Sequence, residues 1–137
     1  MRVMLDLALA DGPGPVRVKE IAERQQLSPK YIEHLISTLK TAGLLRSRRG
    51  MHGGYTLAKP PAKIKLLEIF TLLEGSTRLA GCLEEPGSCP RERRCATRTV
   101  WAEIADAMTG VLESTTLEDL ADRQRNMERT TSTMYHI

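Results

Sequence analysis

The chain has few aromatic residues and no apolar segment long enough to cross a membrane. Phe, Trp and Tyr make up only 4% of its 137 residues, which argues against an aromatic-rich β-sandwich or barrel. No apolar run approaches the ~20 residues that span a bilayer, and no signal peptide opens the sequence. We therefore expect a cytoplasmic protein with no membrane partner.

The sequence also lacks the residue arrangements of an enzyme. No Ser/His/Asp set, phosphate-binding loop or pair of carboxylates stands out, so we predict no catalytic residues. A content of 41% hydrophobic and 27% charged residues is ordinary for a globular domain. The net charge of +3 is too small by itself to indicate a nucleic-acid partner.

Cysteine is absent except in one Gly/Pro-containing polar loop, which holds Cys82, Cys89 and Cys95. Their odd number prevents complete pairing as disulfides, and thiols stay reduced in the cytoplasm. Three thiolates on one loop suit a metal or iron–sulfur centre. The sequence therefore predicts that this loop binds a cofactor.

The first half of the chain predicts two short helices, a tight turn and a hairpin. Apolar residues recur at helical spacing over 18–25 and 29–42, and the turn between them ends at Ser28, a favourable N-cap. Short strands at 44–48 and 55–57 flank a glycine-rich tip. This order is typical of a winged helix-turn-helix, whose second helix enters the major groove of DNA.

Polar side chains on the second helix and in the hairpin are candidates for DNA contact. On the helix, hydroxyl, amino and phenol groups suit phosphate oxygens, whereas acidic and imidazole groups suit base edges. An arginine on a glycine-rich tip suits the narrow minor groove of A·T-rich DNA. The candidates are Ser28, Lys30, Tyr31, Glu33, His34, Ser37, Arg46, Arg48, Arg49 and His52.

The second half is expected to be helical as well. Periodic apolar residues predict one helix that ends at Gly75 and a long helix over 97–112 that carries Trp101. A capping box then predicts the start of a short helix that ends near Arg125. We thus divide the mostly α-helical chain into a DNA-binding domain (1–75), a cysteine loop (76–96), a dimerisation helix with a short C-terminal helix (97–125) and a disordered tail (126–137).

With these motifs in order, the chain resembles the IscR/NsrR-type (Rrf-type) family of bacterial winged helix-turn-helix transcriptional regulators. The matching segments are 4–8, 21–25, 28–35, 43–44, 49–55 and 116–120, together with the three cysteines and Trp101. The resemblance implies a homodimer on a palindromic operator of double-stranded DNA. It also implies an iron–sulfur cluster bound by the three cysteines. Glu33 corresponds to the acidic residue that the family has on the second helix, and Arg49 corresponds to its wing arginine.

Two departures from the family pattern bear on the cluster. Some members have a histidine ligand where this chain has Arg98, and others take an acidic ligand from the first helix, which here begins roughly ten residues, or three turns, late. Asp6 is a poor substitute for that ligand. We expect Met1 to be an internal or truncated start.

The chemistry of the cysteine loop therefore has several possible forms. Because the histidine is missing, a [4Fe–4S] cluster is favoured over [2Fe–2S]. The alternatives are a structural zinc ion or redox-active thiols in a winged-helix repressor. A further alternative is a protein-interaction module that does not bind DNA.

Overall fold

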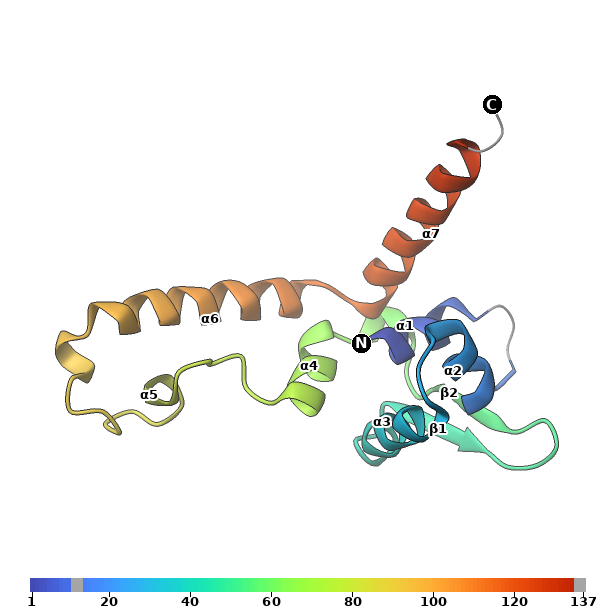
Figure 1. Ribbon diagram of the computed structural model, residues 1–137, viewed down its shortest axis with the longest axis horizontal. Coiled ribbons are helices and arrows are strands. Elements are labelled where there is room, and N and C mark those ends of the chain that lie inside the picture. Colours follow the sequence, from blue (N-terminus) through green and yellow to red (C-terminus); the bar gives the residue numbers. More distant parts are fainter. Residues whose placement is uncertain (11–13, 135–137) are drawn as a thin grey trace.

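The computed structural model describes residues 1–10 and 14–134. In Figure 1, the first helices and a hairpin gather at one end of the molecule, a long helix lies between them and the cysteine loop, and the last helix projects outward. The α-helices are α1 (Arg2–Leu9), α2 (Val18–Gln25), α3 (Pro29–Thr41), α4 (Leu66–Glu74), α5 (Gly81–Glu84), α6 (Ala96–Ser114) and α7 (Leu117–Met134). Strands β1 (Leu45–Arg48) and β2 (Gly54–Leu57) form the hairpin, and 3₁₀ turns cover Pro61–Lys63 and Glu92–Arg94.

The predicted helix-turn-helix is confirmed in α2 and α3. Gln26, directly after α2, adopts a left-handed conformation with φ of 53° and so turns the chain. Ser28 then caps α3 by accepting a hydrogen bond from the backbone N–H of Tyr31 at 3.2 Å. Pro29 occupies the first helical position, where no N–H is needed.

The predicted hairpin is also confirmed, and it forms a wing (residues 45–57) beside α3. Strands β1 and β2 are antiparallel, with Leu45 opposite Leu57. Val16 extends the sheet, because its N–H and C=O bond to Tyr55 at 2.9 and 2.8 Å. Gly54 has a φ of 154°, and a Cβ there would collide with the backbone of Val16. The wing is thus fixed along β2 by the segment that precedes α2.

One apolar core joins the first three helices, the wing and the start of α7. Met4, Ile21, Ile32 and Leu117 are fully buried in it. Each of these residues belongs to the apolar face of a different helix; on α3, for example, Ile32, Ile36 and Leu39 recur at helical spacing and are all buried. Asp6 is the exception on α1, as a buried charged residue.

The long helix α6 is held at both ends but leaves an apolar stripe exposed. It packs against α4, and Thr77 and Thr109 share a hydrogen bond of 2.8 Å. After α6 the chain returns to the core, where Leu117 N–H donates to the Ile64 carbonyl at 2.8 Å. Val100, Trp101, Ile104 and Val111 remain 42–63% exposed. Neither α6 nor any other helix among residues 1–10 and 14–134 is long and apolar enough to span a membrane.

The predicted disorder after Arg125 is wrong for residues 126–134, which continue α7. Local polar bonds take the place of the apolar periodicity that the sequence lacks there. The Gln124 amide donates to Glu128 at 2.8 Å, and the hydroxyls of Thr130 and Thr131 donate to carbonyls four residues earlier. The Gln124–Glu128 side-chain pair is of the i,i+4 kind that stabilises a solvent-exposed helix, and the two threonine bonds satisfy their hydroxyls locally. Residues 135–137 lie outside the described residues.

Candidate DNA-binding surface and cysteine loop

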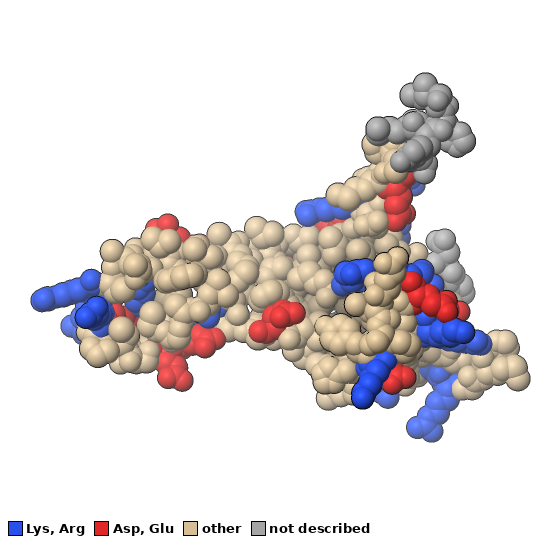
Figure 2. All heavy atoms as spheres, in the orientation of Figure 1, with Lys and Arg blue, Asp and Glu red and all other residues tan. Residues whose placement is uncertain are grey.

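All ten residues predicted to contact DNA are exposed: Ser28 is the N-cap of α3, five others lie in α3, and four lie on the wing. The core side of α3 is occupied by Ile32, Ile36 and Leu39, so its polar residues face outward. Figure 2 shows Lys and Arg side chains gathered over the end of the molecule that holds α2, α3 and the wing. This surface has the charge and hydrogen-bonding groups that a DNA backbone requires.

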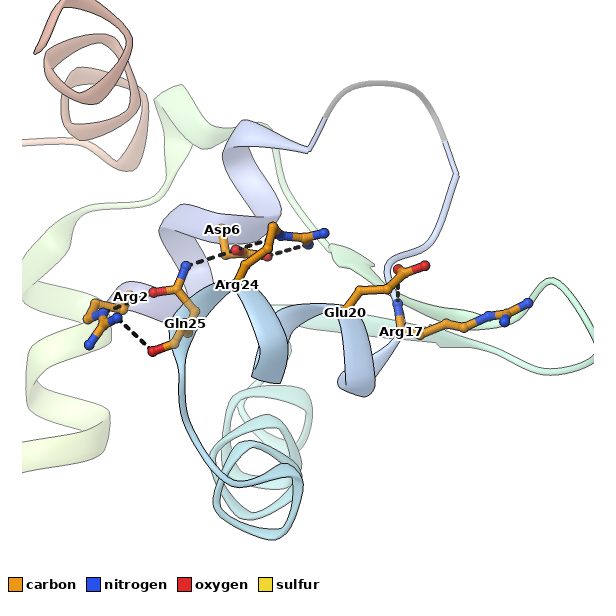
Figure 3. Close-up of polar contacts among 6 residues, drawn as sticks. All are labelled: Arg2, Asp6, Arg17, Glu20, Arg24 and Gln25. Atoms are coloured by element: carbon orange, nitrogen blue, oxygen red, sulfur yellow. Dashed lines mark hydrogen bonds and ion pairs between the residues drawn. The ribbon is translucent and has the colours of Figure 1, made fainter. Parts of the chain in front are cut away.

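A buried ion pair fixes α1 to α2 behind this surface. The Asp6 carboxylate accepts bonds from Arg24 Nε at 3.0 Å, Arg24 Nη2 at 2.6 Å and Gln25 Nε2 at 2.8 Å (Figure 3). Its side chain is 4% exposed, whereas that of Arg24 is 49% exposed. Asp6 is therefore occupied in holding the two helices together.

The three cysteines lie on different parts of one loop. Cys82 is in α5, Cys89 follows a turn, and Cys95 is the N-cap of α6; all three are unpaired and half-buried. Three thiols are the kind of donor set that an iron–sulfur cluster uses. Among residues 1–10 and 14–134, however, no three His, Cys, Asp or Glu side chains are gathered closely enough to hold a metal ion. The donor chemistry fits a cluster, and binding one requires the loop to draw the sulfur atoms together.

Cys95 differs from the other two thiols in its surroundings. Its Sγ lies 3.0 Å from the Thr97 hydroxyl. This hydrogen bond, supported by the backbone N–H of Arg98, lowers the pKa of the Cys95 thiol below its ordinary value. A larger fraction of Cys95 is then thiolate near neutral pH, the form that reacts with oxidants and binds metals.

Arg98, the residue at which the sequence departs from the family pattern, is engaged within the loop. Its Nη2 pairs with Glu92 at 2.9 Å, and Glu92 also accepts the N–H of Gly87 at 2.5 Å. The Nε of Arg98 is buried and has no hydrogen-bond partner. The sequence identified Arg98 as a departure from the family's ligand pattern. It did not indicate the pairing with Glu92, because several acidic residues lie nearby in the sequence and their spacing does not show which one Arg98 contacts.

A helix-turn-helix that leads into a basic wing, with exposed polar groups on both, defines a winged helix-turn-helix DNA-binding regulator. Comparison with known proteins places the chain further: it belongs to the Rrf2 family, described as iron-dependent transcriptional regulators, whose profile matches residues 1–123. These relatives are regulators and not enzymes, in agreement with the sequence prediction.

Similar proteins carry different regulatory descriptions. The chain is 43% identical over 119 residues to protein rrf2 of Nitratidesulfovibrio vulgaris, covering 87% of this chain and 79% of that protein. Its fold matches B. subtilis CymR, described as the global cysteine regulator, with a TM-score of 0.75, 40% identity and 89% of each chain covered. It also matches T. potens IscR with a TM-score of 0.73 and 39% identity, over 90% of this chain and 80% of that one.

Proposed function

We propose that this protein is a transcriptional regulator whose operator affinity depends on an iron–sulfur cluster held by Cys82, Cys89 and Cys95. The observation that carries the proposal is the position of Cys95 at the start of α6. Through α6, the cysteine loop is connected to α4 and then to the core of the DNA-binding domain. A change in the loop therefore has a direct mechanical route to the DNA-binding surface.

The exposed stripe of α6 supports a homodimer. Four large apolar residues on one face of a long helix are costly to leave in water. A second copy of α6 would cover them, and two-fold symmetry would present two copies of α3 to a palindromic operator. The two half-sites of such an operator lie one helical turn, about 34–36 Å, apart along the DNA. Small changes in the angle at which the two α6 helices cross would therefore alter how well both α3 helices reach their half-sites.

The three thiols would supply three corner ligands of a [4Fe–4S] cluster, which brings redox chemistry and an iron site open to exchange. The protein's part is to couple the closure of the loop to the N-terminus of α6. A coupling free energy of about 1–3 kcal/mol is sufficient for a 5–150-fold change in operator affinity. The signal therefore acts through the geometry of α6 and not through direct contact with DNA.

Replacing Cys89 tests the cluster directly. Protein purified anaerobically is expected to contain about four iron atoms and four acid-labile sulfides per chain, and Cys89→Ala is expected to lose both. Operator affinity, measured by fluorescence anisotropy with and without the cluster, should differ about 5–150-fold in the parent protein and not in the variant. Ser88→Ala, one residue away, is the matched control and should behave like the parent. Zinc in place of iron, or neither metal after reconstitution, would contradict the cluster.

Replacing Arg49 tests the wing. Arg49→Ala is expected to cost about 1–3 kcal/mol in operator binding if the guanidinium enters a groove, with a much smaller loss on random DNA. Arg123→Ala removes the same charge from exposed α7 and should leave both affinities nearly unchanged. Equal losses on operator and random duplexes in a titration would mean that Arg49 contacts phosphate alone.

A thiol switch without metal is the second candidate. It is favoured by the lowered pKa of Cys95 and by the separated arrangement of the three sulfurs. The similarity to CymR, a cysteine regulator, also supports it. The two candidates separate in iron-free protein, where oxidation of the thiols would change operator affinity only under this second mechanism.

A further inference from the structure

An arginine at the start of α2, absent from the DNA contacts predicted from the sequence, reaches the tip of the wing. Arg17 Nη2 donates a hydrogen bond of 2.6 Å to the carbonyl of Met51, 34 residues further along the chain. Figure 3 shows the Arg17 side chain extended toward the hairpin. The sequence around Arg17 does not indicate this role, because the contact forms only when the wing has folded beside α2.

The backbone of Arg17 is fixed on both sides of this contact. The preceding residue, Val16, exchanges two hydrogen bonds with Tyr55 in β2, and Gly54 lies directly against Val16. The N–H of Arg17 itself donates to the Glu20 carboxylate at 3.0 Å in the first turn of α2. The guanidinium therefore extends from a rigid base to the tip of the wing.

The tip (residues 49–53) has little else to hold it. Met51 is 84% exposed, and the turn closes internally through Gly53 N–H and the Gly50 carbonyl at 3.0 Å. In the part of the chain that the structure describes, the Arg17 contact is the only hydrogen bond between the tip and another element. Without the Arg17 contact, the glycine-containing tip would sample more conformations in the free protein and would lose more conformational entropy on binding DNA.

We propose that Arg17 is a positioning residue that braces the wing tip, so that Arg49 and His52 are already placed for DNA when α3 docks. The proposal rests on the DNA-binding function given above. Ordering a mobile tip on binding has an entropic cost, and a brace in the free protein removes it. Losing the brace should therefore weaken operator binding about 3–10-fold, a size typical of ordering a single interface side chain.

The brace can first be tested without DNA. In the free protein, Arg17→Ala should speed amide hydrogen exchange at residues 50–53 and leave exchange in the core of α3 unchanged. Lys19→Ala is the matched control, since Lys19 is 83% exposed on the same turn of α2 and pairs with Glu23, not with the wing. Unchanged exchange at the tip in Arg17→Ala overturns the brace.

A double-mutant cycle then tests the positioning role. Operator duplexes selected from random-sequence DNA by the parent protein serve as the probe. Arg17→Ala should lower affinity about 3–10-fold when Arg49 is present and clearly less in an Arg49→Ala background, where only His52 still depends on the placement of the tip. Equal losses in both backgrounds, with a salt slope reduced by about one, would show that Arg17 binds phosphate itself and overturn the proposal. If the parent protein selects no duplex, the proposed function fails, whereas the exchange experiment still decides the brace.

Discussion

Ile104→Asp is expected to weaken operator binding by about 100-fold or more, because it places a charge at the centre of the exposed stripe on α6. Ile104 is 42% exposed, and Val100, Trp101 and Val111 share its face of the helix. A buried, unpaired carboxylate in a symmetric interface would occur twice and cost several kcal/mol. A monomer then meets one half-site and loses the contacts of the other. Sedimentation velocity and operator titration measure the two effects on the same sample.

Thr99→Asp provides the control for this variant. Thr99 is exposed on the opposite, polar face of α6, so an aspartate there has the same charge without entering the stripe. Its dimerisation and operator binding should remain close to those of the parent protein. A monomeric Ile104→Asp that binds the operator at full affinity would show that the second copy is unnecessary. If Ile104→Asp remained dimeric, the exposed stripe of α6 would lie outside the dimer interface.

Periodicity and capping predicted the helices of the DNA-binding domain closely. Ile32, Ile36 and Leu39 recur at helical spacing and are all buried, and Ser28 caps α3 as its residue type suggested. The glycines at 50, 53 and 54 indicated the hairpin because tight turns need their backbone freedom. In these segments, local preference and tertiary packing favour the same structure, so the sequence alone was sufficient.

The sequence was less informative where bonds between distant polar groups decide the structure. The pairing of Arg98 with Glu92 and the reach of Arg17 to Met51 depend on how the chain folds back. The extension of α7 beyond Arg125 was missed because apolar periodicity, the main signal for a helix, is absent from it. The cysteine loop was identified by residue type alone, and the separation of its thiols could not be read from their spacing.

Arg24→Ala is expected to lower the free energy of unfolding by about 2–4 kcal/mol, more than the removal of its partner Asp6. The Asp6 side chain is 4% exposed, and losing Arg24 leaves its carboxylate with Gln25 as a remaining donor. A buried charge without its partner typically costs 3–5 kcal/mol. The estimate here is lower because Arg24 is 49% exposed, so water can partly replace it. Urea denaturation followed by circular dichroism measures the change.

Asp6→Ala should cost only about 1–2 kcal/mol, since the half-exposed guanidinium that it leaves behind can be hydrated. The double variant should consequently be more stable than Arg24→Ala alone, because it no longer contains a buried unpaired carboxylate. Strictly additive losses would mean that the pair contributes through the packing of the arginine stem and not through charge. Ranking the three variants by their free energy of unfolding thus shows which side chain is more costly to leave without its partner. We expect this to be Asp6, because its side chain is 4% exposed and that of Arg24 is 49% exposed.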